Sequence, residues 1–404
     1  MVGYGVIFCV AAVGTYLLTF PTRRFAEHSG AVVVPDDRDV HTGTTPTSGG
    51  GAMFLAMLAA MVAASQMPEF KNVFQRSSEP LGVVLAAATI FMVGLVDDLR
   101  EMSAPAKIAG QVLAATVLYF LGVTMFQFKV PLFGFVVLSP DITPLITALW
   151  VVGIANAVNL IDGLDGLATG IVAIAAGALC VYGLRLEELG WLSSGNIGPL
   201  VAVIACGICV GFLPHNFHPA RIFMGDAGSM LLGLLMAAST MVIGGRTPDV
   251  SGDAYFFFAP LFIPFFILGV PILDMAFAIV RRTAKRSGVA TPDKDHLHHR
   301  LIRLGHGYRR SVLILWAWTA ILSGFVLYPL FNPKGNAIIP FGVAALGVGL
   351  YTLFHPSIRR HPAPGEIGNG DESSDREVRG GRRETIASSK GGATGHAGAA
   401  GGHP

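Results

Sequence analysis

Charged residues are scarce in this chain, and their scarcity excludes an ordinary soluble domain. Asp, Glu, Lys and Arg make up 13% of the 404 residues, whereas hydrophobic residues make up 52% and the mean hydropathy is +0.59. Soluble globular domains carry about 25% charged residues. The composition therefore predicts an all-α integral membrane protein, because apolar runs that cross a bilayer satisfy their backbone hydrogen bonds as helices.

Cysteine and the common nucleotide-binding motifs are also rare or missing. The four cysteines, including Cys206 and Cys209, sit inside apolar runs, so we interpret them as packing residues rather than a disulfide framework or metal site. The sequence contains no Walker-type Gly-rich loop and no nucleic-acid-binding motif, so no nucleic-acid partner is expected. The first apolar run lacks a charged n-region and is predicted to be a retained span.

Apolar runs of spanning length recur along the chain and predict a polytopic bundle of about 11 transmembrane helices. The runs fall at roughly 2–20, 50–66, 80–96, 107–125, 142–160, 165–184, 197–213, 228–245, 255–280, 311–331 and 336–354. Residues 126–140 alternate bulky apolar residues and suit a short external β-hairpin. We predict a transmembrane domain over 1–355 and a disordered cytoplasmic tail over 356–404, which is rich in Gly, Ser and charge.

The positive charges predict how these helices are oriented. Loops that follow odd-numbered helices contain fifteen Lys and Arg residues, whereas loops after even-numbered helices contain six. Cytoplasmic loops are enriched in Lys and Arg. The bias therefore predicts a multi-pass membrane protein with an external N-terminus and a cytoplasmic C-terminus.

Three acidic clusters fall on the predicted cytoplasmic face. Asp97 and Asp98 end the third run, the segment 156–166 ends the fifth, and Asp226 precedes the eighth. Carboxylates near hydrocarbon are costly, so a shared site is favoured over three solvated helix ends. Paired carboxylates suit a divalent cation or acid–base work, and Lys107 could hold a phosphate, although an anchoring role at the membrane surface is an alternative.

A basic segment on the same face predicts an anion-binding helix. Thr291 to Gly305 carries capping residues at both ends, and His296, His299 and Arg300 share one face of the expected helix. Zinc binding by this His-rich string is the alternative, but cysteine and carboxylate ligands are missing at suitable spacing. Oxygen ligands without thiolates favour Mg²⁺, or Mn²⁺, over zinc. Together these groups predict a diphosphate site.

Four ordered motifs closely resemble the polyprenyl-phosphate N-acetylhexosamine-1-phosphate transferases (glycosyltransferase 4, the MraY–WecA superfamily). They are GLVDDL (94–99), NAVNLIDGLDGLATG (156–170), FMGDAGSM (223–230) and DHLHHRLIRLG (295–305). The last motif is similar to the WecA/TagO-like branch, which implies an enzyme that transfers GlcNAc-1-phosphate from UDP-GlcNAc to an undecaprenyl or decaprenyl phosphate and releases UMP. The partners implied are UDP-N-acetylglucosamine, the polyprenyl phosphate and the membrane, and a homodimer is compatible with them. The resemblance also implies a bacterial cytoplasmic membrane with the active site on its cytoplasmic face.

The resemblance also implies roles for individual residues. The implied catalytic residues are Asp97, Asp98 and His296, and the implied Mg²⁺ ligands are Asn159 and Asp226. The implied substrate-binding residues are Lys107, Asn156, Asp162, Asp165, Phe223, His298, His299 and Arg300. The segment 41–50 (HTGTTPTSGG) departs from the family, whose members often place a Lys or Arg there. His41 is a candidate to replace that cation.

Three other functions compete with this interpretation. A phospho-MurNAc-pentapeptide transferase would use the same chemistry on a different donor. An intramembrane aspartyl protease needs two lone aspartates at mid-membrane, whereas these carboxylates are clustered and flanked by amides. An ion-coupled transporter usually shows inverted repeats with a site at the midplane, and neither is evident in the sequence.

Overall fold

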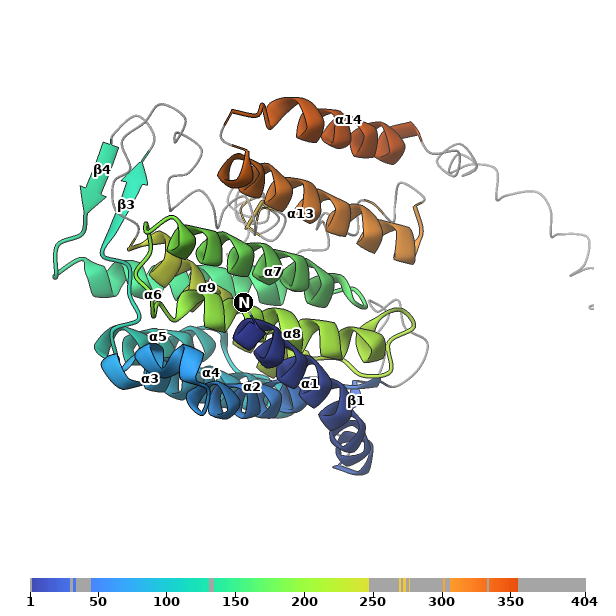
Figure 1. The fold of residues 1–404 in the computed structure, drawn as a ribbon. Coiled ribbons are helices and arrows are strands. Elements are labelled where there is room, and N and C mark those ends of the chain that lie inside the picture. Colours follow the sequence, from blue (N-terminus) through green and yellow to red (C-terminus); the bar gives the residue numbers. More distant parts are fainter. Residues whose placement is uncertain are drawn as a thin grey trace, which may run out of the picture. The chain divides into compact units, whose positions relative to one another are not determined.

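The computed structural model describes residues 2–29, 32–33, 45–130, 134–246, 269, 272–273, 276, 301, 306–332 and 334–354. Met1–His355 form one compact unit, and its described part is built mainly from helices (Figure 1). The long helices are α1 (Val2–Ser29), α2 (Gly49–Ser65), α4 (Glu79–Leu99), α5 (Ala104–Phe120), α6 (Thr143–Ile161), α7 (Leu167–Glu188), α8 (Gly198–Asn216), α9 (Gly225–Gly244), α13 (Tyr308–Phe331) and α14 (Ile338–Phe354). The short elements are η1 (Pro68–Phe70), α3 (Lys71–Arg76), β1 (Val32–Val33), β2 (Thr45–Pro46), β3 (Gln127–Val130) and β4 (Gly134–Val137).

The helices agree with a multi-pass membrane protein. Within the described residues, seven helices are long and apolar enough to span a bilayer, or eight if α2 and the segment Pro68–Arg76, bent by 89°, form one broken span. Each predicted apolar run except 255–280 coincides with one of the long helices, and 255–280 lies almost wholly outside the described residues. The number eleven therefore stays a prediction.

Two local features refine the expectations from sequence. The predicted hairpin is confirmed as an antiparallel pair in which Gln127 lies opposite Val137 and Val130 opposite Gly134. Helix α1 continues to Ser29, beyond the apolar run that predicts it, because backbone hydrogen bonds do not require apolar side chains once the helix leaves the hydrocarbon.

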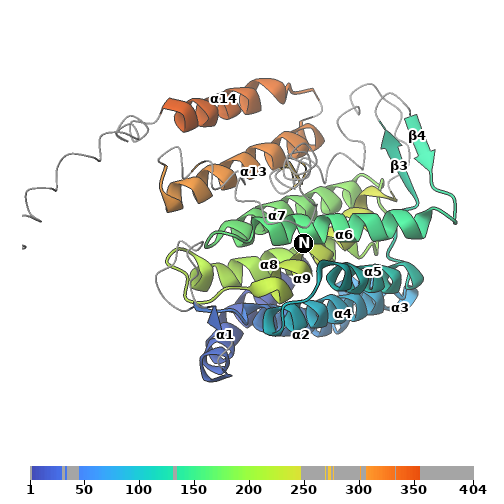
Figure 2. The ribbon, with the colours of Figure 1, turned by 180° about the vertical axis from the view of Figure 1, so that it is seen from behind.

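Helix α9 is the core of the bundle. Every residue from 227 to 244 is buried, and the helix packs against α2, α4, α6, α7 and α8. Figures 1 and 2 show it enclosed by these helices from both sides. Small residues allow the close approach: a Cβ at Gly233 would lie 2.5 Å from the Cα of Ala155 on α6. Side chains larger than glycine at this contact would therefore push α9 away from α6.

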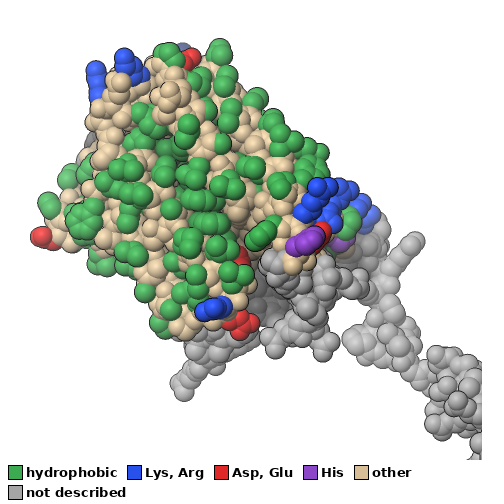
Figure 3. Space-filling view, turned by 90° about the horizontal axis from the view of Figure 1, so that it is seen from below, with side chains coloured by type: hydrophobic (Ala, Val, Ile, Leu, Met, Phe, Trp, Pro, Cys, Tyr) green, Lys and Arg blue, Asp and Glu red, His purple; other side chains and the backbone are tan. Residues whose placement is uncertain are grey.

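The outer surface of the bundle is apolar, as expected for contact with lipid. Figure 3 shows hydrophobic side chains spread over one face, with charged side chains gathered at its margins. Exposed side chains such as Leu55, Val62 and Leu81 are more than half accessible. Because α4 and α6 end where α5 and α9 begin, polar residues at these four helix ends meet at one end of the bundle.

Candidate active site

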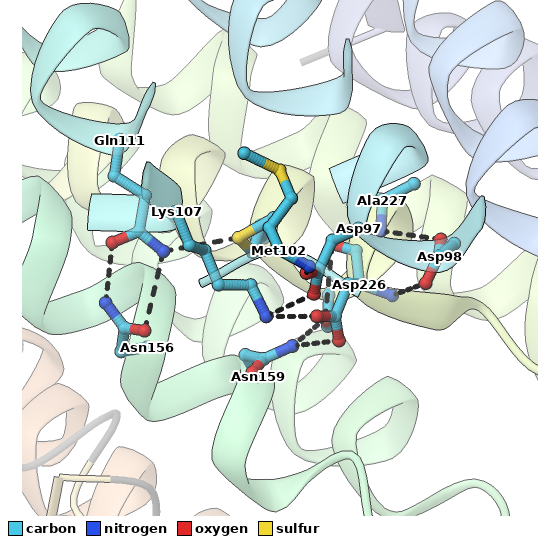
Figure 4. Close-up of polar contacts among 11 residues, drawn as sticks. Asp97, Asp98, Met102, Lys107, Gln111, Asn156, Asn159, Asp226 and Ala227 are labelled. Atoms are coloured by element: carbon cyan, nitrogen blue, oxygen red, sulfur yellow. Dashed lines mark hydrogen bonds and ion pairs between the residues drawn. The ribbon is translucent and has the colours of Figure 1, made fainter. Parts of the chain in front are cut away.

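Asp98 connects the end of α4 to the start of α9. Its Oδ1 accepts a hydrogen bond from the backbone N–H of Asp226 at 2.7 Å, and its Oδ2 accepts one from Ala227 at 3.1 Å (Figure 4). The N-cap residue of α9, Met224, makes no side-chain cap. A carboxylate at this position also complements the helix dipole. Asp98 therefore caps α9 from a neighbouring helix.

Lys107 lies between two carboxylates at the start of α5. Its ammonium is 2.6 Å from Asp97 Oδ2 and also forms an ion pair and hydrogen bond with Asp226 Oδ2 (Figure 4). Asp97 Oδ1 accepts a further hydrogen bond from the backbone N–H of Met102 at 2.7 Å. The lysine remains partly accessible, with 20% of its side chain exposed. The ammonium of Lys107, on α5, thus lies between carboxylate oxygens of α4 and α9.

Asn159 at the end of α6 completes this group. Its Nδ2 donates to Asp226 Oδ1 at 2.7 Å and to Ser229 Oγ at 2.9 Å. Ser229 is fully buried and lies one turn after Asp226 on α9. Both oxygens of Asp226 are therefore held, one by an amide and one by an ammonium group.

A second polar layer lies one helical turn deeper. Asn156 Nδ2 donates to Gln111 Oε1 and to the carbonyl of Val152, both at 2.7 Å, and Gln111 Nε2 is 3.2 Å from the sulfur of Met230. Gln111 follows Lys107 by four residues and is fully buried. Residues three or four apart share a helix face, so the layer forms a floor beneath the site.

The start of α2 and the residues just before it hold the segment that leads into α9 through backbone hydrogen bonds. The N–H of Phe223 donates to the carbonyl of Pro46 at 2.8 Å, and the N–H of Gly49 returns to the carbonyl of Phe223 at 3.0 Å. Gly50 donates to the carbonyl of Met224 at 2.9 Å. The described part of the segment 41–50, which departs from the family, therefore forms backbone hydrogen bonds with the motif FMGD. His41 lies outside the described residues.

Asp165 holds the loop between α8 and α9. Its Oδ2 accepts hydrogen bonds from His218 Nδ1 at 2.8 Å and from the backbone N–H of Ala220 at 3.0 Å. Its own N–H donates to the hydroxyl of Tyr308 at 2.9 Å, and the His218 ring stacks on Tyr308 with centroids 4.4 Å apart. The start of α13 is therefore joined to the same loop.

Asp162 directly follows the last turn of α6. Loss of hydration raises the pKa of its carboxylate, and the charges of Asp226, Asp98 and Asp165 raise it further. The helix ends here, as the sequence predicts: α7 begins at Leu167 after Gly166, whose φ is 74°. A left-handed residue of this kind favours glycine.

Of the nine predicted site residues that the structure describes, it brings six together. Direct side-chain and backbone hydrogen bonds or ion pairs join Asp97, Asp98, Lys107, Asn159 and Asp226, and the Asn156 side chain lies in the layer below. His296, His298, His299 and Arg300 lie outside the described residues. Sequence reasoning missed Gln111, Ser229, His218 and Tyr308. Two of them carry a signal in the sequence: Gln111 is an amide within the apolar run of α5, and Ser229 stands within the motif FMGDAGSM.

The donor set suits a hard divalent cation. Among the described residues, no three His, Cys, Asp or Glu side chains are grouped closely enough to hold a metal by themselves. Asp226 and Asp97 nevertheless offer carboxylate oxygens around a position that already holds the Lys107 ammonium, and Asn159 contributes an amide group beside Asp226. Mg²⁺ is commonly bound through one or two carboxylates plus substrate phosphates and water, so these residues fit it.

Comparisons with known proteins agree with the family resemblance of the sequence. The model of glycosyl transferase family 4 matches residues 80–244. The decaprenyl-phosphate N-acetylglucosaminephosphotransferase of Mycobacterium tuberculosis (strain ATCC 25618 / H37Rv) is 41% identical over 357 residues, covering 87% of this chain and 88% of the relative. A probable undecaprenyl-phosphate N-acetylglucosaminyl 1-phosphate transferase of Bacillus subtilis (strain 168) is 34% identical, and the match covers 81% of this chain and 83% of the relative. A phospho-N-acetylmuramoyl-pentapeptide-transferase of Desulforudis audaxviator is 32% identical, and the match covers 69% of this chain and 82% of the relative.

Proposed function

The chain belongs to glycosyl transferase family 4, and on this basis we propose that it transfers N-acetylglucosamine 1-phosphate from UDP-GlcNAc to a polyprenyl phosphate. The observation that carries the proposal is the group of Asp97, Lys107, Asn159 and Asp226 at one end of the bundle. Two relatives named for GlcNAc-1-phosphate transfer match at 41% and 34% identity, and a MurNAc-pentapeptide transferase matches at 32%. GlcNAc is therefore the favoured sugar.

The reaction is a phosphoryl transfer between two anions. An oxygen of the acceptor phosphate bonds to the β-phosphorus of the donor, the bond from that phosphorus to the bridging oxygen breaks, and UMP leaves. Such reactions depend mainly on positioning and charge neutralisation. Lys107 supplies a cation between the helices. Asp97 can release its contact with Lys107 and then contact the acceptor phosphate or accept a proton from it.

Asp226 and Asn159 would hold Mg²⁺, which when bound would neutralise phosphate charge and help align the donor diphosphate. Ser229 keeps the Asn159 amide in place by accepting its second hydrogen bond. The floor formed by Gln111 and Asn156 closes the site toward the membrane interior with paired amides. Water is then excluded from below while the partly exposed Lys107 faces the approach of substrate.

The remaining predicted contacts extend this site. His296, with His298, His299 and Arg300, is proposed to hold the donor phosphates, and Asp162 and Phe223 to lie on the uridine side. Asp165 serves that side by holding the loop that leads to Phe223, because its Oδ2 is bonded to His218 and Ala220. The excess of Lys and Arg in the loops at this end supports a cytoplasmic site.

The proposal is tested by the release of UMP from purified protein in detergent or vesicles. UDP-GlcNAc, UDP-GalNAc and UDP-MurNAc-pentapeptide should be offered separately with polyprenyl phosphate, with and without EDTA. We expect release that requires both lipid and divalent cation and is fastest with UDP-GlcNAc. Preference for the MurNAc donor would instead assign the peptidoglycan reaction, and release without lipid would indicate a covalent aspartyl route.

A further inference from the structure

We infer that Asp98 is a positioning residue that fixes Asp226 through its backbone, and that Asp97 alone of the pair is available to the substrates. The inference deepens the proposed function and rests on it. It divides two adjacent carboxylates, which sequence alone treats as one acidic pair, into different roles.

The hydrogen bonds of Asp98 carry the inference. Both of its oxygens accept N–H groups from the first turn of α9, at 2.7 Å and 3.1 Å (Figure 4). First-turn N–H groups have no partner inside their own helix. Turning the carboxylate toward a substrate would leave two such donors unpaired, and a buried N–H without a partner is destabilising. Asp98 is thus committed to the framework.

Two glycines near Asp98 leave room for this contact, because a larger side chain at either position would collide with its neighbours. Gly225 has a φ of +67°, and a Cβ there would lie 2.6 Å from Asp98 Oδ2 and 2.6 Å from the carbonyl oxygen of Thr47. One turn before Asp98 on α4, a Cβ at Gly94 would lie 2.7 Å from the carbonyl carbon of Asp226. The backbones of α4 and α9 therefore meet directly, and Asp98 lies at the end of this contact.

Asp97 has different surroundings. Its Oδ2 contacts the ammonium of Lys107 at 2.6 Å, and Lys107 is a flexible side chain with 20% of its surface exposed. A substrate phosphate can replace Asp97 as the partner of this cation, after which the carboxylate can meet the acceptor. Only one oxygen of Asp97 is tied to the backbone, through Met102.

The decisive experiment compares Asp98→Asn and Asp97→Asn with Glu101→Gln, an exposed carboxylate-to-amide control in the next loop. For Asp98→Asn we expect kcat to fall about tenfold or more, with the shape of the pH profile unchanged. For Asp97→Asn the loss should depend on pH and be greatest at low pH. Gly225→Ala keeps every titratable group but displaces the cap, so it should behave like Asp98→Asn.

A second measurement does not depend on activity. Amide hydrogen exchange at Asp226 and Ala227 should accelerate at least tenfold in Asp98→Asn and in Gly225→Ala, but not in Asp97→Asn. Unchanged exchange in Asp98→Asn, or a pH profile altered as in Asp97→Asn, would overturn the inference. Wild-type protein that releases no UMP would count against the proposed function instead, and the exchange result would still decide the role of Asp98. If Asp98→Asn cannot be recovered folded, Gly225→Ala carries both comparisons.

Discussion

Lys107 is the residue whose removal tests the charge balance of the site most directly. Lys107→Met removes the cation between Asp97 and Asp226 while keeping much of the side-chain volume. We expect UMP release to fall about 10²–10³-fold, because a preorganised charge that stabilises phosphoryl transfer is lost. Lys71→Met on the exposed face of α3 is the matched control and should be near wild type. Equal activity of the two variants would remove Lys107 from the mechanism.

Asp162 gives a pH dependence of stability. Its folded-state pKa is raised by lost hydration and by neighbouring carboxylates, so the folded protein binds its proton more tightly than the unfolded chain. Stability should therefore fall as pH rises from the ordinary aspartate value through the raised one. Asp162→Asn removes this contribution.

The measurement is thermal unfolding in detergent with EDTA, compared between wild type and Asp162→Asn across that pH window. The difference should favour the variant increasingly as pH rises and then level off. A difference that is constant with pH would show that Asp162 ionises equally in both states.

At the scale of elements, the contact between α4 and α9 should tolerate no added atoms. Gly94→Ala would place a Cβ 2.7 Å from the carbonyl carbon of Asp226, and overpacking of this kind costs about 1–3 kcal/mol. Because Asp98 moves with α4, activity should fall as well. Thermal unfolding and UMP release measure the two effects.

Gly153→Ala on α6 is the control for this substitution. A Cβ at Gly153 would meet nothing within 4 Å, so the variant should be neutral or gain up to about 1 kcal/mol in helix propensity. Equal destabilisation by both substitutions would show that the α4–α9 contact is looser than its geometry indicates.

The same contact shows what sequence can and cannot predict. Hydropathy locates the long helices because a bilayer requires apolar runs of a given length, and the ends of α4, α6 and α9 place their carboxylates at one level. Which N–H meets Asp98, or that Gln111 pairs with Asn156, depends on the rotation and spacing of packed helices. Small residues such as Gly94 set that spacing, and a hydropathy profile gives them no special weight.

For the whole molecule, the bias of loop charges predicts a testable topology. A reporter fused after Arg286 should be read in the cytoplasm, and one fused after Lys129 should be read outside, because Lys and Arg concentrate in cytoplasmic loops. Alkaline phosphatase and green fluorescent protein fusions measure the two sides. Reversed readings would place the acidic site on the side that lacks nucleotide sugars.

The enclosure of α9 has a consequence for how the protein responds to bilayer thickness. Hydrophobic mismatch acts on helices that touch lipid, such as α14, which is 17 residues or about 25 Å long and has no buried residue. Helix α9 is buried over residues 227–244, so the surrounding helices separate it from the acyl chains. In a thin or thick membrane the outer helices should therefore tilt, while the carboxylate of Asp226 at the start of α9 keeps its hydrogen-bond partners.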